Sequence, residues 1–186
     1  AQHPLIRSQY LLEEIDEEAR LFPAATRALM RGSHPRQQGP TEGREYALLV
    51  DVGGEVEGAA GLGGAELREA QPRRDSTALT VVEVARTPLG LPSYLAVDRL
   101  RWTGRAHLEL AGAIATLADL WGARRVVVDA TGLGAGLASL LTRTLRDRVT
   151  PFVFTAVSKS ALGWGFLGIC GSGRFLDHRD DGSPEH

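Results

Sequence analysis

Two aspartates each end a short apolar run in this sequence, and together they could carry metal-dependent chemistry. Asp51 ends the run 46–50, and Asp129 ends the run 126–128. A carboxylate at the end of a buried strand is unfavourable unless another group pairs with it. If the two strands are neighbours in one sheet, the carboxylates converge at its edge. There they repel each other unless a divalent cation lies between them.

A carboxylate pair of this kind suits phosphodiester hydrolysis. Mg²⁺ and Mn²⁺ prefer oxygen ligands. Two such ions about 4 Å apart can activate a water molecule and stabilise the leaving oxygen. We therefore predict Asp51 and Asp129 as catalytic metal ligands. For each aspartate taken alone, the alternative is a cap of a turn or helix, a common role of Asp after a strand.

Further charged residues are candidates for the same site. Asp75 directly precedes a predicted strand and is a possible third ligand on the same rim. Its alternative is an exposed loop charge paired with the adjacent arginines. Four basic residues are candidate DNA contacts, with solvated surface charge as their alternative: Arg73, Arg74, Lys159 and Arg174.

The glycine-rich segment 129–136 allows a different interpretation. Glycines between a strand and a helix can cradle a phosphate at the helix N-terminus. The spacing is not G-x-G-x-x-G, however, and the chain has no Gly-Lys-Ser/Thr of a P-loop. A nucleotide-binding domain of the actin or sugar-kinase type is thus an alternative that a nucleotide titration would test. The same glycines could also let a DNA backbone approach or merely permit a tight turn.

The elements that must position these residues follow an α/β order. Runs of apolar and β-branched residues predict five strands and a short final extended piece, at 46–52, 76–84, 94–102, 125–129, 151–154 and 173–176. Apolar residues at helical spacing predict three helices, at 107–121, over the segment holding Leu137 to Leu145, and at 158–169. An antiparallel start that becomes parallel β-α-β implies a mixed sheet flanked by helices. The continuous hydrophobicity of 46–50 predicts a central strand buried on both faces.

Two segments lie outside this core pattern. Residues 1–40 read as a helical arm or connector, with a short helix at 24–30 and a loop broken by Gly and Pro at 32–40. Residues 53–74 are rich in Gly, Ala and charge and predict an exposed loop insertion. We therefore take 41–186 as the globular domain.

Composition narrows the function classes. The 186 residues include 43% hydrophobic residues, enough for a buried core, and the net charge of −2 argues against a free-standing DNA-binding module. The single cysteine, Cys170, excludes an intrachain disulfide and a cysteine-rich zinc site, and we expect it to be a small buried apolar residue. The sequence has no apolar run of membrane-span length and no signal-peptide pattern, so we expect a cytoplasmic protein.

Several segments together resemble the nuclease domain of the large terminase subunit of tailed phages and prophages. They are 33–36, 46–51, 74–79, 127–136, 159–167 and 173–175, in this order and spacing. The resemblance implies an RNase H-like fold and a metal-dependent endonuclease that cuts concatemeric double-stranded DNA during head filling. It places Asp51 as the first acidic ligand and Asp129 as the second. Asp75 is similar to an additional acid found shortly after the first.

The resemblance also implies partners and a third acid. Residues 1–40 would connect to a packaging ATPase domain, and the small terminase subunit and portal would be partners, in the cytoplasm of a bacterial host and without a membrane. The family's third acid lies well beyond the segment 173–175, so we expect it outside this chain, which would then bind metal weakly and cut poorly. Asp177, Asp180 and Asp181 are possible replacements, of which we name Asp181.

Two other functions share these features. Another RNase H-like nuclease, such as a Holliday-junction resolvase, would have the same carboxylates but prefer branched DNA. A catalytically silent domain that docks a packaging ATPase onto its portal or DNA would fit a missing third acid.

Overall fold

A computed structural model describes residues 21–53 and 76–179. Its elements, in chain order, are α2 (Ala24–Leu29), β1 (Glu45–Asp51), β2 (Ser76–Arg86), β3 (Pro92–Thr103), α3 (His107–Leu120), β4 (Arg125–Asp129), α4 (Gly134–Leu145), the 3₁₀ turn η3 (Arg146–Arg148), β5 (Val149–Phe152), α5 (Ala156–Gly171) and β6 (Phe175–Asp177). The predicted loop 53–74 lies, apart from Gly53, outside the described residues. None of the described helices is long and apolar enough to cross a membrane.

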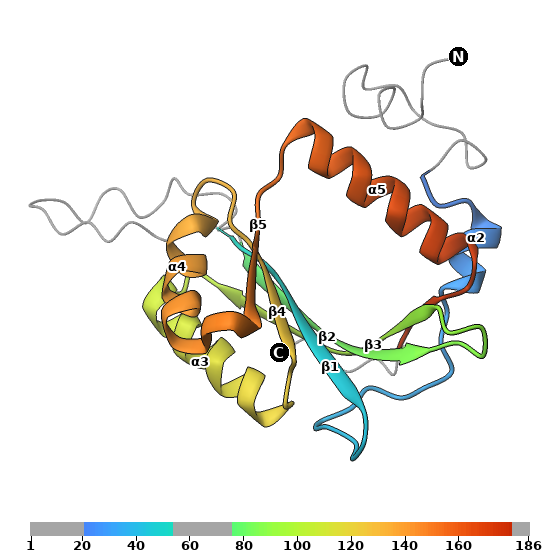
Figure 1. Cartoon of the computed structure of the whole chain (residues 1–186), viewed down its shortest axis with the longest axis horizontal. Coiled ribbons are helices and arrows are strands. Elements are labelled where there is room, and N and C mark those ends of the chain that lie inside the picture. Colours follow the sequence, from blue (N-terminus) through green and yellow to red (C-terminus); the bar gives the residue numbers. More distant parts are fainter. Residues whose placement is uncertain (1–20, 54–75, 180–186) are drawn as a thin grey trace, which may run out of the picture.

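The described strands form one mixed sheet in the order β5-β4-β1-β2-β3-β6 (Figure 1). β1, β2 and β3 are joined antiparallel, whereas β4 lies parallel to both β1 and β5. This confirms the predicted antiparallel start followed by parallel β-α-β units. It also makes β1 and β4 direct neighbours, which is the condition for the two predicted carboxylates to meet.

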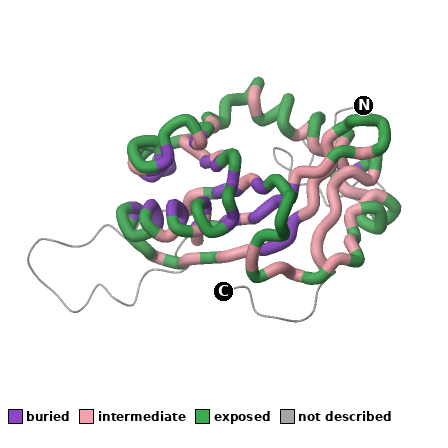
Figure 2. Tube along the Cα trace, turned by 60° about the horizontal axis from the view of Figure 1, so that its bottom comes forward, coloured by how far each residue is buried: buried purple, intermediate pink, exposed green. Residues whose placement is uncertain are grey.

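One face of the sheet, here called the helical face, is covered by α3 and α4 (Figure 1). Strand β1 contributes Tyr46, Leu48 and Val50 to this face, all buried. The helices contribute the apolar stripes that their periodicity predicts, including Leu110, Ile114, Leu137 and Leu141. Figure 2 shows how the buried residues gather in this part of the molecule. The core therefore lies between α3, α4 and the helical face.

The opposite face, here called the open face, carries Ala47, Leu49 and Asp51 of β1. Burial along β1 alternates, and Leu49 is 43% exposed while Leu48 beside it is fully buried. The prediction that β1 is buried on both faces was therefore wrong. The physical reason is that α5, the helix on this side, contacts α2 and β6 instead of packing down onto β1.

Helix α5 is attached through its C-terminal half. The ring of Phe166 stacks edge-on against Phe22 at 5.8 Å and against Phe175 at 5.2 Å. Cys170 is fully buried, as predicted for a small apolar residue, and it is the one buried residue of this helix. The N-terminal half of α5, including Val157 and Leu162, stays exposed above the sheet.

The segment that follows α2 runs along the β3–β6 edge of the sheet. Arg31 forms a parallel bridge with Asp177, and the backbone N–H of Gln37 donates to the Val97 carbonyl at 2.8 Å. Arg36 Nε donates to Asp98 Oδ1 at 2.6 Å, with both side chains largely buried. These contacts make residues 31–37 part of the folded body. That residues 1–40 lead to an ATPase domain stays a prediction.

The fifth strand begins and ends two residues earlier than predicted, at Val149–Phe152. Phe154 leaves the sheet because its backbone N–H donates to Thr131 Oγ1 at 2.8 Å. The strand ladder ends instead where the Ala130 N–H donates to the Phe152 carbonyl at 2.8 Å. After β5, the backbone therefore bonds to the side chain of Thr131 in the loop and no longer to strand β4.

Candidate functional site

The ends of β1 and β4 bring Asp51 and Asp129 together. The parallel register pairs Val50 with Val128, so the next residues of the two strands are neighbours. Adjacent strands lie about 4.8 Å apart. Both aspartates share the open face with Leu49 because side chains alternate along each strand.

Asp51 offers its carboxylate to solvent. This carboxylate has no hydrogen bond or ion pair with any described residue, and Asp51 is exposed. The chain just beyond it is tied down, because the Gly53 N–H donates to Thr77 Oγ1 at 3.1 Å. Thr77 is buried on β2. The end of β1 is thus held in place while its carboxylate stays accessible.

Asp129 uses one carboxylate oxygen in the turn that follows β4. Its Oδ1 accepts a hydrogen bond from the Thr131 N–H at 2.8 Å. This is the turn-capping role that a single Asp after a strand can play. The second oxygen, Oδ2, has no described partner, so the turn orients the carboxylate and leaves one oxygen for a ligand.

Glycines set the geometry between Asp129 and α4. Gly132 has a φ of 55°, in the left-handed region that favours glycine. At Gly134 a Cβ atom would lie 2.1 Å from the Asp129 carbonyl oxygen. The helix can therefore begin this close to the strand end only if position 134 has no side chain. This supports the tight-turn interpretation of the glycine-rich segment.

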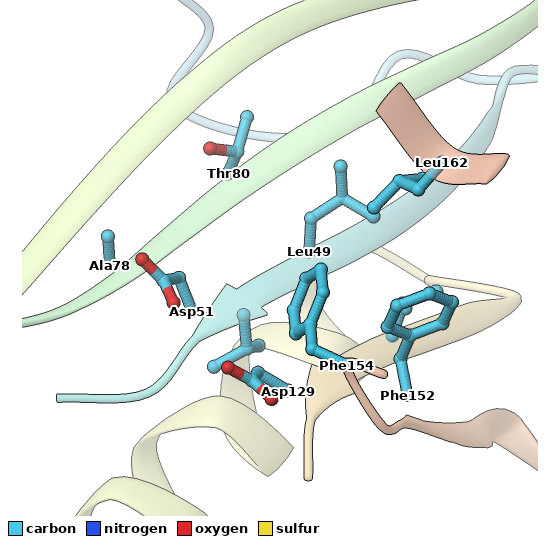
Figure 3. A pocket seen from close by; sticks show the side chains of 10 residues that line it. Leu49, Asp51, Ala78, Thr80, Asp129, Phe152, Phe154 and Leu162 are labelled. Atoms are coloured by element: carbon cyan, nitrogen blue, oxygen red, sulfur yellow. The ribbon is translucent and has the colours of Figure 1, made fainter. Parts of the chain in front are cut away.

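A pocket of about 420 Å³ opens on the open face beside the two aspartates (Figure 3). It extends from the carboxylates along β1 and β4 to the exposed side of α5, and its walls are mostly apolar. The lining residues are Leu49, Val50, Asp51, Ala78, Thr80, Val127, Asp129, Phe152, Phe154 and Leu162. In Figure 3, Asp51 and Asp129 lie together at one end of this space.

Comparison with known proteins assigns the family. Residues 69–180, more than half of the chain, match the family model described as the terminase RNaseH-like domain. The chain belongs to this family. No curated protein sequence matches it.

Solved structures of phage terminases share the fold. The large terminase nuclease from thermophilic phage G20c with bound magnesium superposes with a TM-score of 0.59 at 15% identity, covering 87% of this chain and 75% of that one. The large terminase nuclease domain of Thermus phage P74-26 gives 0.57 at 14% identity, covering 87% and 73%. The HK97 bacteriophage large terminase gives 0.52 at 11%, covering 86% of this chain but 34% of the longer one. The predicted RNase H-like fold is confirmed.

The donor set of this terminase RNaseH-like domain fits a hard divalent cation. Two carboxylates from adjacent strands present oxygen atoms, the ligands that Mg²⁺ and Mn²⁺ prefer. Among residues 21–53 and 76–179, no three His, Cys, Asp or Glu side chains are grouped to hold a metal ion. Within this part of the chain, Asp51 and Asp129 would therefore share the ion with water and substrate oxygens.

The other predicted site residues of the terminase domain fall into three groups. Asp75, Asp181, Arg73 and Arg74 lie outside the described residues. Lys159 is exposed on α5, one turn before the pocket-lining Leu162 and thus on the same side of the helix. Arg174 lies beside the first residue of β3, at the end of the sheet away from Asp51. There its guanidinium donates to Ser172 Oγ at 2.9 Å and to the Pro92 carbonyl at 3.0 Å.

Asp177, considered as a replacement third acid, is committed elsewhere in the terminase domain. Its Oδ2 accepts from Arg99 Nη2 at 2.8 Å. Its backbone also bonds to the segment after α2, since its carbonyl accepts from the Gly32 N–H at 2.8 Å. Asp177 stands on β6, three strands from β1, so the structure does not bring it to Asp51.

Sequence reasoning missed the residues that hold the carboxylates in position. Thr131 and Gly134 were seen only as parts of a glycine-rich segment. The signal that could have found Thr131 is the Asp-x-Thr spacing, because an Asp side chain often accepts from the N–H two residues on. The need for glycine at 134 depends on how close α4 comes to β4, which no local pattern encodes.

Proposed function

We propose that this domain is a divalent-metal-dependent endonuclease that cuts double-stranded DNA, with Asp51 and Asp129 as its central metal ligands. The observation that carries the proposal is the adjacency of these two carboxylates, on one open face and beside a pocket. Membership of the terminase family and the solved phage nucleases with bound magnesium, cobalt and zinc support it.

The residues would divide the work as follows. Asp51 would offer its exposed carboxylate, and Asp129 would offer Oδ2 while Thr131 holds Oδ1. Two bound divalent ions would activate the attacking water and stabilise the leaving oxygen of the phosphodiester. Gly134 fixes the backbone that carries Asp129. Leu49 and Phe152 form an apolar wall beside the two carboxylates.

The family resemblance and the remaining candidate residues supply the further parts of the proposal. Asp75, and Asp181 in the tail, are proposed as additional ligands, and Arg73, Arg74, Lys159 and Arg174 as DNA contacts. The substrate would be concatemeric viral DNA, cut during packaging in the cytoplasm of the bacterial host. A packaging ATPase domain, the small terminase subunit and the portal would be the partners.

Cleavage of supercoiled plasmid DNA tests the proposal. We expect nicking and linearisation in Mn²⁺ or Mg²⁺ and none in EDTA. Asp51→Asn and Asp129→Asn should each reduce the rate by more than about 100-fold, because loss of an outer-shell partner alone costs about 10- to 100-fold. Asp147→Asn is the matched control, since Asp147 is an exposed aspartate at the opposite end of the parallel strands. Metal-dependent cleavage that survives both site substitutions would contradict the assignment.

Metal binding without DNA separates failure of binding from failure of cutting. Electron paramagnetic resonance of Mn²⁺ reports bound ion directly, and Asp51→Asn should weaken that binding while Asp147→Asn should not. Equal Mn²⁺ binding by the wild type, Asp51→Asn and Asp147→Asn would rule out the carboxylate pair as the metal site. A four-way junction cut in preference to linear duplex would favour a resolvase instead.

A second candidate function is a domain that binds metal and DNA without cutting. The observation in its favour is that the described residues bring two acids together and no third. A folded protein that binds Mn²⁺ and DNA but leaves plasmid intact would support this alternative. Restored cleavage on extension of the chain beyond His186 would return the assignment to a nuclease.

A further inference from the structure

An arginine on β3 lies in the same cross-strand row as the two aspartates. Asp51 pairs with Ala78 on β2, and Ala78 pairs with Arg101 on β3. Residues paired across a sheet point to the same face. The side chain of Arg101 therefore stands on the open face, level with Asp51 and Asp129.

The face of Arg101 is set by a β-bulge. Val81 pairs with Asp98 but Val82 pairs with Ala96, so Val97 is an extra residue on β3. A bulge reverses which side chains face which way along the rest of a strand. Trp102, next to Arg101, accordingly packs against the core on the helical face. Arg101 must point the other way.

Within the sheet, one small residue separates Arg101 from Asp51 in this row. Two strand spacings, about 9.6 Å, separate the backbone of Asp51 from that of Arg101. The residue between them in the row is Ala78, which has only a methyl side chain and itself lines the pocket. A long arginine side chain can thus extend across the methyl group of Ala78 toward a phosphate near Asp51.

Arg101 also differs from its neighbouring arginines. Arg99, two residues before Arg101 on β3 and on the same face, is ion-paired with Asp177 at 2.8 Å. Arg36 is ion-paired with Asp98 at 2.6 Å. The side chain of Arg101 is exposed and, among residues 21–53 and 76–179, has no hydrogen bond or ion pair. Its five N–H donors are thus not used by any described residue.

We propose that Arg101 binds a DNA phosphate adjacent to the one held at Asp51 and Asp129. The proposal rests on the nuclease function above and adds a specific substrate contact to that site. A nuclease whose acids repel the DNA backbone needs cations beside them, and this chain has a net charge of −2. The guanidinium fork matches phosphate oxygens in a bidentate arrangement. With Lys159 on α5, Arg101 would flank the pocket from the opposite side.

The test combines DNA binding, metal binding and cleavage in one set of variants. Binding of a short duplex is measured in Ca²⁺ at several salt concentrations for wild type, Arg101→Gln, Arg101→Lys and Arg143→Gln. Arg143 is the matched control, an exposed arginine on α4 on the other side of the sheet. Mn²⁺ binding without DNA and thermal unfolding are measured on the same proteins.

We expect Arg101→Gln to weaken DNA binding about tenfold, as loss of a charge-assisted hydrogen bond does. The slope of log K against log salt should fall by about 1, the signature of one lost phosphate contact. Plasmid cleavage should fall with binding, while Mn²⁺ affinity and the unfolding temperature stay as in wild type. Arg101→Lys should recover part of the binding, because lysine keeps the charge without the fork.

Each other outcome overturns a defined part of the argument. If the wild type cuts DNA with metal and Arg101→Gln behaves like Arg143→Gln, Arg101 is not a phosphate contact while the nuclease assignment stands. If Arg101→Gln lowers Mn²⁺ affinity or the unfolding temperature by as much as it lowers DNA binding, its role is structural. If the wild type binds neither Mn²⁺ nor DNA, the proposed nuclease function is wrong, and the proposed phosphate contact of Arg101 is wrong as well.

Discussion

The two faces of the sheet in this terminase domain differ in what covers them. On β1, Leu48 is fully buried under α3 and α4, while the adjacent Leu49 is 43% exposed on the other side. The helical face carries the apolar contacts that stabilise the domain. The open face carries Asp51 and Asp129, together with a pocket that extends to α5 (Figure 3). The apolar core and the candidate site thus lie on opposite sides of the same strands.

The helices on the two sides show the same contrast. Helix α4 buries Leu137, Leu141 and Leu145 against the sheet, whereas α5 buries only Cys170. Helix α5 therefore lies over the open face and is attached mainly through its C-terminal half. We expect substitutions on the helical face to change stability and substitutions on the open face to change activity.

Leu48→Ala and Leu49→Ala form the sharpest test of this contrast, because they are the same change at adjacent positions. Leu48→Ala should cost about 2–5 kcal/mol of unfolding free energy, as a cavity in a closed core does. Leu49→Ala should cost about 1 kcal/mol or less, since much of its side chain is already in water. Urea unfolding measures both. Equal losses would show that the open face is covered in solution.

Two glycines in helices should respond with opposite signs. Gly134→Ala should cost about 1–3 kcal/mol, as overpacking does, because the new Cβ meets the Asp129 carbonyl oxygen. It should also slow cleavage by shifting Asp129. Gly163→Ala on α5 meets no atom within 4 Å and should stabilise by about 0.5–1 kcal/mol through helix propensity. Thermal unfolding of both variants measures the signs, and stabilisation by Gly134→Ala would contradict the close approach.

Thr131 should have a smaller and more local effect. Thr131→Val removes the acceptor of the Phe154 N–H and should cost about 1 kcal/mol. The cleavage rate should fall by more than the loss of folded protein explains, because the same loop orients Asp129. Thr131→Ser keeps the hydroxyl and is the control. Normal cleavage by Thr131→Val would show that the backbone N–H alone suffices to orient the carboxylate.

The smallest expected effect is a pH dependence from Cys170. Burial raises the pKa of the Cys170 thiol in the folded protein, while an unfolded thiol titrates near pH 8.5. Its contribution to stability is therefore fully present below about pH 8.5 and is lost as the pH rises through the folded pKa. Urea unfolding from pH 7 to 10 should show a steeper decline for wild type than for Cys170→Ala. Parallel curves would mean that the thiol is accessible to water.

Much of this fold could be predicted from local pattern. The strand order along the chain, the helix at 107–121 and its stripe through Leu110 and Ile114 follow from periodicity, which reflects burial on one side of an element. The openness of the second face could not be predicted. An apolar run such as 46–50 looks the same whether its second face meets a packed helix or a pocket, and here α5 is held away by its contacts to α2 and β6.

For the candidate site, the sequence by itself determined the residue types: an aspartate at the end of each of two apolar strands, and a glycine-rich turn after the second. Only the tertiary structure decided that β1 and β4 are neighbours in parallel register, that Gly134 touches the Asp129 backbone, and that Arg101 shares their row. The physical reason is that register is fixed by hydrogen bonds between distant segments. The bulge at Val97 shows this most directly, because it reverses the faces of the residues after it and places Arg101 on the same face as the carboxylates.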